Sequence, residues 1–221
     1  MWLCGWHVTS KQLLQEGSSR LGIELSESEV ALLLRYVEEL KKWNRRINLV
    51  ARDTDDAAII ENHFIDSLTL RPIIEQQQAR SLLDVGTGAG FPGLVLAAVL
   101  PNVRFTLVEP RKKRVFFLKH IVRTLQLANV DIIAERLEAV DVKKGKTFDL
   151  VTSRAVAAPD QFLPMVKPYL ERGSRAIVMI ARKAVLEATK LQDAFQVIRL
   201  EEHVLPFSQA PRVLALVSLT S

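Results

Sequence analysis

The sequence predicts an α/β fold, in which a doubly wound and largely parallel sheet ends in an antiparallel hairpin and is preceded by a small helical segment. From residue 81 onward, short apolar runs alternate with amphipathic stretches, as in strands joined by crossover helices. Before that point, apolar residues recur only at helical spacing. The length of 221 residues suits one domain with a small appendage, and we place these at residues 76–221 and 1–75.

Two helices are predicted within the helical segment. Residues 26–29 read Ser-Glu-Ser-Glu, the S-x-x-E form of a capping box, and apolar residues at helical spacing follow them. These signals predict a helix over about 27–43. Residues 56–70 carry apolar residues four apart and predict a second helix. The first 20 residues match no such pattern, so we expect them to form a disordered extension.

The sheet is predicted from five short apolar runs and two longer extended runs. The five short runs, expected as parallel strands, are 82–85, 103–108, 130–134, 148–152 and 176–180. Helices are expected between them at 92–100, 111–127 and 160–170. The extended runs, 197–205 and 212–219, are separated by only six residues, too few for a crossover helix. They should therefore pair as an antiparallel hairpin at one edge of the sheet.

A glycine-rich turn, within LLDVGTGAGFPG at 82–93, separates the first predicted strand from the first helix. Counted from Gly88 it matches the dinucleotide fingerprint G-x-G-x-x-G. If the strand ends at Val85, however, the turn begins at Gly86, and the glycines are Gly86, Gly88 and Gly90. Glycine adopts positive φ without steric cost and lets backbone N–H groups approach a ligand. Both countings predict a nucleotide-type cofactor, and the second counting gives the better strand end.

Glu109 stands at the carboxyl end of the second predicted strand, 23 residues after Gly86. A carboxylate at this position can bind both hydroxyls of a ribose, in an NAD site or in an S-adenosylmethionine site. The alternative is a carboxylate that merely faces solvent. Glu109 therefore indicates a ribose without identifying the cofactor.

The missing dehydrogenase residues distinguish the two cofactors. A short-chain dehydrogenase needs a Tyr-x-x-x-Lys pair, but the two tyrosines, Tyr36 and Tyr169, are followed at plus four by Leu40 and Gly173. A larger dehydrogenase needs a second domain, for which no residues remain. S-adenosylmethionine, bound at the carboxyl edge of the sheet, is the better interpretation.

Arg154 follows the fourth predicted strand and should lie at the same edge. It can bind the carboxylate of the cofactor, or a phosphate or base of the substrate; the alternative is a surface arginine. An Asp/Asn-Pro-Pro-aromatic run, typical of amino-group methyltransferases, is absent from the sequence. The only cysteine is Cys4, so neither a pyrimidine-type cysteine nucleophile nor a cysteine-rich metal site is expected. No catalytic residue can be named from these patterns.

The charge is modestly basic, with 30 Lys+Arg against 25 Asp+Glu, and by itself decides nothing. Each basic cluster taken alone is best interpreted as a solvent-exposed face. Taken together, and next to a methyl-donor site, the clusters are suited to binding the phosphate backbone of a nucleic acid. The clusters are Lys41, Lys42, Arg45 and Arg46; Arg111, Lys112, Lys113, Arg114, Lys119 and Arg123; and Lys143, Lys144 and Lys146. His63 and Asp66, three apart on one helical face, are interpreted as packing or helix-end residues rather than catalytic ones.

The single cysteine and the short apolar runs also bear on location. One cysteine fits a reducing, cytoplasmic setting, and the longest apolar run is far shorter than the ~20 residues that span a membrane. We expect a soluble protein that is not exported and has no membrane partner.

Several motifs, taken in order, resemble one family. KWNRRINLVA, ENHFIDSLTL, LLDVGTGAGFPGLVLA, KRVFFLKHI and FDLVTSRAVA occur in the same order in the glucose-inhibited division protein B family. These are bacterial guanine-N7 methyltransferases of small-subunit ribosomal RNA. The resemblance implies a helical segment packed on a seven-stranded, Rossmann-like methyltransferase domain. It also implies S-adenosylmethionine as donor and one guanine of 16S rRNA as acceptor, in naked RNA, a 30S subunit or an assembly intermediate.

The resemblance places cofactor contacts at Gly86 and Phe91, at Leu137 and Glu138, and at Arg154. Leu137 and Glu138 follow from the resemblance alone. The chain departs from the family where Glu109-Pro110 replaces a frequent Asp-Ser and where IAR replaces a frequent LKG. A small-molecule methyltransferase on the same fold and a non-catalytic nucleic-acid-binding module remain as alternatives. We expect a monomer.

Overall fold

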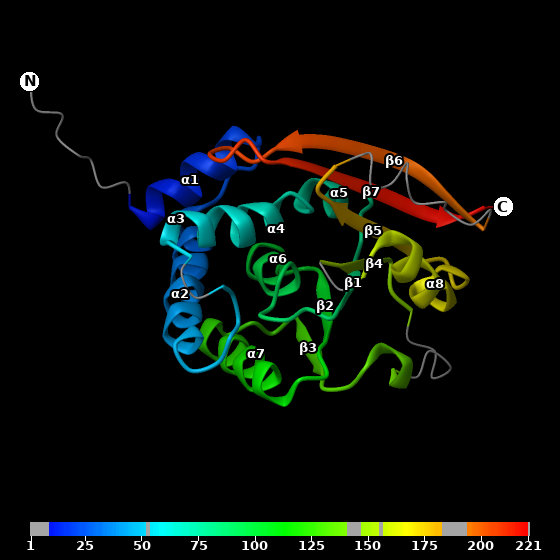
Figure 1. Ribbon diagram of the computed structural model, residues 1–221, viewed down its shortest axis with the longest axis horizontal. Coiled ribbons are helices and arrows are strands. Elements are labelled where there is room, and N and C mark those ends of the chain that lie inside the picture. Colours follow the sequence, from blue (N-terminus) through cyan, green and yellow to red (C-terminus); the bar gives the residue numbers. More distant parts are fainter. Residues whose placement is uncertain (1–8, 52–53, 141–146, 155–156, 183–193, 221) are drawn as a thin grey trace, which may run out of the picture.

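The computed structural model describes residues 9–51, 54–140, 147–154, 157–182 and 194–220, and Figure 1 shows one sheet with helices packed around it. The strands are β1 (Ser81–Val85), β2 (Arg104–Val108), β3 (Val130–Ile133), β4 (Leu150–Ser153), β5 (Arg175–Ile180), β6 (Phe195–Val204) and β7 (Pro211–Leu219). They form a seven-stranded sheet in the order β3-β2-β1-β4-β5-β7-β6. The first five strands are parallel, and β7 is antiparallel to both β5 and β6. The predicted sheet and its edge hairpin are confirmed.

Helices cover both faces of the sheet. Helices α6 (Gly93–Val99) and α7 (Lys112–Leu125) pack with the N-terminal helices into one apolar core. Helix α8 (Pro159–Leu170) covers the other face and belongs to a second core. The short 3-10 helix η2 (Leu137–Ala139) follows β3. Because the chain turns from one side of β1 to the other, the strand order reverses between β1 and β4, and a crevice forms at their carboxyl ends.

The N-terminal part is helical, as predicted, but it begins earlier than expected. Its elements are α1 (Ser10–Arg20), α2 (Glu27–Asn44), α3 (Asp56–Ile59), the π-helix η1 (Ile60–Ile65), α4 (Asp66–Leu68) and α5 (Arg71–Gln76). The capping box at Ser26 and Glu29 forms as predicted. The expectation of a disordered extension over residues 1–20 is wrong for α1, which has its own capping box between Thr9 and Gln12. Residues 1–8 lie outside the described residues.

A π-helical turn interrupts the single helix that was predicted over residues 56–70. Two buried carboxylates at this turn bind the far C-terminal hairpin. Glu61 accepts hydrogen bonds from the backbone N–H groups of Phe207 and Ser208, at 2.6 and 2.9 Å, and Asp66 pairs with Arg212 at 2.8 Å. A π-turn adds one residue per turn and re-aims the side chains around it, which occurs frequently at functional sites.

The helical part and the sheet share one apolar core. Buried residues of α2, such as Leu33 and Leu40, belong to the same cluster as buried residues of α6 and β2. The domain boundary near residue 75 therefore stays a prediction. Within the described ranges, no helix is long and apolar enough to cross a membrane.

Candidate functional site

A pocket with a volume of about 710 Å³ lies at the carboxyl ends of β1, β2 and β4. This is the crevice at which the strand order reverses, where open α/β sheets bind their ligands. Its volume falls within the range of small-ligand pockets, about 300–1,000 Å³. Seven of the predicted site residues line it: Gly86, Gly88, Phe91, Glu109, Leu137, Glu138 and Arg154.

The glycine loop forms the floor of the pocket. Strand β1 ends at Val85, so the turn begins at Gly86, as the counting from Gly86 requires. Gly86 and Gly88 have φ values of 64° and 63°, in the left-handed region that side chains rarely adopt. Both line the pocket, and the absence of a side chain at each leaves the backbone open to a ligand.

Asp84, beneath the loop, fixes its shape. The carboxylate oxygen Oδ2 accepts hydrogen bonds from the Thr87 hydroxyl at 2.6 Å and from the Gly93 N–H at 2.9 Å. Burial raises the pKa of Asp84 to about 7, although these hydrogen bonds act in the opposite direction. A Cβ on Gly93 would lie 2.7 Å from that same oxygen and 2.2 Å from Leu107 Cδ2, so the helix can begin here only with glycine.

Gly90 has a different place from the other two glycines, because it does not line the pocket. A Cβ on Gly90 would lie 2.3 Å from the Tyr36 hydroxyl, on the side of the loop that faces α2. Tyr36 donates a hydrogen bond to the Ala89 carbonyl and stacks on Phe91, with ring centroids 5.7 Å apart. Helix α2 therefore supports the loop from behind, and Gly90 permits that close approach.

Glu109 lies at the end of β2, where the sequence predicts a ribose-binding carboxylate. It is buried, lines the pocket and accepts hydrogen bonds from the backbone N–H groups of Gly88 at 3.1 Å and Arg111 at 2.9 Å. Arg114 lies 3.7 Å from the same carboxylate. Each carboxylate oxygen has two acceptor positions, so the group retains capacity for ligand hydroxyls. Glu109 both ties the glycine loop to β2 and lines the pocket, and its role in binding a ribose stays a prediction.

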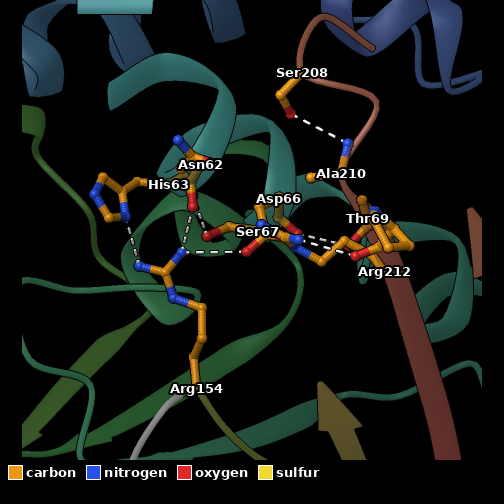
Figure 2. A network of polar contacts seen from close by, with 10 residues as sticks. Asn62, His63, Asp66, Ser67, Thr69, Arg154, Ser208, Ala210 and Arg212 are labelled. Carbon is orange, nitrogen blue, oxygen red and sulfur yellow. Dashed lines mark hydrogen bonds and ion pairs between the residues drawn. The ribbon is translucent and has the colours of Figure 1, made fainter. Parts of the chain in front are cut away.

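Arg154 follows β4 and reaches across the pocket to η1, as Figure 2 shows. Its guanidinium donates to the Asn62 carbonyl at 2.7 Å and to His63 Nδ1 at 2.9 Å, and it lies 3.3 Å from an Asp66 carboxylate oxygen. It also lies over the Phe91 ring, 4.9 Å from the centroid. The planar guanidinium is thus held by four residues, Asn62, His63, Asp66 and Phe91, so Arg154 is not the surface arginine of the alternative interpretation.

His63 is a neutral hydrogen-bond donor in the pocket wall. Burial, and then the neighbouring Arg154 cation, lower the pKa of His63 to about 4, so the ring carries no charge at physiological pH. Because a guanidinium has only donors, Nδ1 must accept the bond from Arg154, and the proton lies on Nε2. The ring stacks on Phe91, with centroids 5.0 Å apart.

Two further walls come from the segments after β2 and β3. Leu137 and Glu138 of η2, which only the family resemblance predicted, line the pocket. Arg111 and Arg114, from the second basic cluster, line it as well. The third basic cluster, Lys143, Lys144 and Lys146, lies outside the described residues.

Sequence reasoning missed part of the wall. It interpreted His63 and Asp66 as packing residues, and it did not single out Asn62 or Arg212; the structure places all four around the pocket. The usable signal was the spacing of His63 and Asp66 on one helical face. Their partner Arg154 lies about 90 residues away in sequence, and only the tertiary fold brings them together.

Comparisons with known proteins agree with this geometry. The family model described as rRNA small subunit methyltransferase G, GidB, matches residues 29–215. Ribosomal RNA small subunit methyltransferase G of Desulfotalea psychrophila is 41% identical over 207 residues, covering 91% of this chain and 94% of its own. The protein of the same name from Geobacter sulfurreducens is 36% identical over 208 residues, covering 92% and 94%.

The fold is also that of solved methyltransferases. An O-methyltransferase from Bacillus cereus, solved in complex with SAH, has a TM-score of 0.61 at 16% identity and covers 93% of this chain and 97% of its own. A putative O-methyltransferase from Klebsiella pneumoniae has a TM-score of 0.59 at 17% identity, with 95% and 100% covered. At such identities the likeness establishes the fold, while the family model and the curated relatives establish the family. The chain belongs to the rRNA small subunit methyltransferase G family, as its ordered motifs indicated.

Proposed function

We propose that this protein transfers the methyl group of S-adenosylmethionine to N7 of one guanine in 16S ribosomal RNA. The observation that carries this proposal is the match to the rRNA small subunit methyltransferase G family over residues 29–215, with a cofactor-sized pocket at the carboxyl edge of the sheet. The small-molecule alternative has no comparable support, because relatives named for an RNA substrate cover almost the whole chain.

The residues of the pocket fit S-adenosylmethionine. Gly86 and Gly88 leave room for the amino-acid portion of the cofactor near the loop backbone, and Glu109 offers acceptors for the two ribose hydroxyls. Leu137, from η2, supplies an apolar surface for the adenine. When bound, this cofactor supplies a methyl group activated by attachment to a sulfonium.

The proposed reaction requires the alignment of guanine N7 with the methyl group of the cofactor, and it requires no proton transfer. Guanine N7 carries an in-plane lone pair and no proton, so no general base is needed. The proposed role of the protein is to hold N7 and the methyl group in line, which can contribute about 7–11 kcal/mol in favourable cases. His63, neutral and fixed by Arg154 and Phe91, offers an N–H donor beside the cofactor position.

The acceptor sets the partners and the location. We infer that the enzyme acts on 16S rRNA in a 30S subunit or an assembly intermediate, in the cytoplasm, where bacterial ribosomes are made, and that it works as a monomer. The exposed cations beside the pocket, such as Arg111, support an RNA substrate.

Methyl transfer from labelled S-adenosylmethionine tests the proposal. The substrates are small-subunit rRNA that lacks base modifications, offered naked and within 30S particles. Gly86→Asp should abolish transfer, because the new carboxylate would fill the approach to the loop backbone at a φ of 64°. Gly173→Asp likewise places an aspartate at a positive φ, 94°, but in an open turn that does not line the pocket, and it should leave transfer unchanged.

Two outcomes would contradict this proposal. Absence of label in both RNA substrates, with S-adenosylhomocysteine still binding in a calorimeter, would refute the RNA acceptor and favour a small molecule. Normal affinity of Gly86→Asp for S-adenosylhomocysteine would refute the placement of the cofactor on the loop.

A further inference from the structure

A second hollow, of about 500 Å³, lies between the end of α2 and α7, two helices that contact each other (Figure 1). None of its lining residues belongs to the cofactor pocket. The lining combines aromatic and basic side chains: Trp43, Ile47, Lys113, Phe116, Lys119, His120 and Arg123.

One aromatic wall of this hollow is rigid and the other is exposed. Trp43 packs against Phe117 and His120, with ring centroids 5.6 and 5.1 Å away, and His120 is itself bonded to Glu39 at 2.6 Å. Phe116 is 63% exposed, the largest exposed fraction among the large hydrophobic residues of the described chain. An exposed aromatic face beside cations is the arrangement on which proteins stack unpaired nucleic-acid bases.

The rim of the hollow is positively charged. Lys113, Lys119 and Arg123 are exposed, and none of them forms an ion pair with an acidic residue in the described part of the chain. Glu39, which is bonded to the lining residue His120, is already paired with Lys42 and His120. The rim therefore has cations available for phosphates.

A third hollow, of about 390 Å³, connects this place to the cofactor pocket. It shares Ile47 and Lys113 with the second hollow, and Arg111 and Arg114 with the cofactor pocket. Its remaining lining is Arg46, Asn48 and Lys112, which are exposed. The second and third hollows thus adjoin each other and reach from Trp43 and Phe116 to the cofactor pocket, and we call these two hollows the α2–α7 track.

We propose that the α2–α7 track binds a single-stranded stretch of the substrate RNA next to the target guanine, with an unpaired base held between Phe116 and Trp43. This inference rests on the proposed function. Charge complementarity selects RNA as the occupant, because the track is lined by cations over its whole length while its aromatic side chains are confined to one end. The track gives the enzyme a second hold on the RNA, remote from the methyl donor.

The test compares Phe116→Leu with Phe116→Trp. Leucine keeps an apolar side chain but removes the aromatic face for stacking, whereas tryptophan retains such a face. Neither substitution should disturb the packing of the protein, because the Phe116 side chain is mostly exposed to solvent. We expect Phe116→Leu to raise the Kd for naked, transcribed 16S rRNA, and the KM for 30S particles, by about tenfold, while kcat and the Kd for S-adenosylhomocysteine stay unchanged. Phe116→Trp should restore wild-type values.

The cations are tested through salt dependence. The double variant Lys113→Ala, Lys119→Ala should weaken RNA binding and reduce the slope of log Kd against log salt by roughly 0.7 per lost phosphate contact. Arg172→Ala is the matched control, because this exposed arginine lies in the turn between α8 and β5 and lines none of the three hollows. It should leave the salt slope unchanged.

The outcomes separate this inference from the proposed function. If the wild-type protein methylates RNA and Phe116→Leu does so with unchanged Kd and KM, the track is refuted and the function stands. A raised KM for 30S particles with an unchanged Kd for naked RNA would also refute it, and would assign the surface to a ribosomal protein. If the wild-type protein methylates no RNA, the proposed function itself fails.

Discussion

At the scale of single residues, Asp84 couples the glycine loop to pH. Its pKa is raised by burial from an ordinary 3.8 to about 7, so between these values the folded state holds a proton that the unfolded state has lost. Its contribution to the free energy of unfolding is therefore highest below about pH 4, falls by up to roughly 4 kcal/mol as pH rises through this interval, and levels off above pH 7.

Replacing Asp84 by Asn removes this dependence, because an amide cannot lose the proton. The amide oxygen can still accept from Thr87 and Gly93. We expect the difference between the free energies of unfolding of Asp84→Asn and wild type, measured in urea titrations, to rise steadily between about pH 4 and pH 7. It rises because the contribution of Asp84 to the wild-type value falls over this range. A difference that stays constant across this range would show that Asp84 is charged throughout.

Arg154 holds the wall of the pocket by its shape as much as by its charge. Arg154→Lys keeps the cation but loses the fork that joins Asn62, His63 and Asp66. We expect kcat/KM for RNA to fall at least tenfold and the free energy of unfolding to fall by about 1–3 kcal/mol, because a buried carbonyl or carboxylate loses its donor. Steady-state kinetics and urea unfolding measure the two effects, with Arg172→Lys as control. Unchanged kinetics would mean that the wall has no role in the reaction.

The same residues show where sequence reasoning ends. Gly86, Glu109 and Arg154 were predicted because each follows a strand directly, and the carboxyl ends of parallel strands meet at one edge. The structural hydrogen bonds of His63 and Asp66 agree with their interpretation as packing or helix-end residues, but their place in the pocket wall was not predicted because their partner Arg154 is far away in sequence. A buried His-Arg contact depends on tertiary structure that no local pattern records.

At the scale of elements, α2 acts as a support for the glycine loop through Tyr36. Tyr36→Phe would leave the buried Ala89 carbonyl without its donor, which should lower the free energy of unfolding by about 1–3 kcal/mol and raise the Kd for S-adenosylhomocysteine. Tyr169→Phe is a matched control, since the buried Tyr169 hydroxyl has no partner among the described residues. Chemical denaturation and calorimetry measure both quantities. Equal effects of the two variants would contradict the supporting role of α2.

Elements with strong local periodicity were predicted well, and those shaped by distant partners were not. Each of the seven strands was placed within two residues, since apolar runs and turns mark them. The π-turn in η1 was missed because Ile60, Phe64 and Leu68 fit an ordinary helix, while the bonds of Glu61 to Phe207 and Ser208 come from the C-terminal hairpin. Helix α1 was not predicted, although the Thr9-x-x-Gln12 capping box is a local signal for its start.

At the scale of the whole molecule, the pocket is built from both ends of the chain. The glycine loop comes from the sheet, His63 from the N-terminal helices, and Arg212 from β7, which binds Asp66. In Figure 1 the β6–β7 hairpin runs along the sheet edge with its turn next to α1, and Arg20 donates to the Pro206 carbonyl there. The α/β class and the parallel strands could be predicted from the sequence. The way in which the N-terminal helices and the β6–β7 hairpin together complete the pocket could not.

The measurement that tests the central claim most directly is the identification of the methylated atom. Unmodified 30S particles would be incubated with the protein and S-adenosylmethionine, and the RNA then treated with the reduction and aniline cleavage that cut specifically at N7-methylguanine. The account predicts cleavage at a single guanine of 16S rRNA, absent when the Gly86→Asp variant replaces the wild-type protein. Methyl incorporation without such cleavage, or cleavage at many guanines, would contradict it.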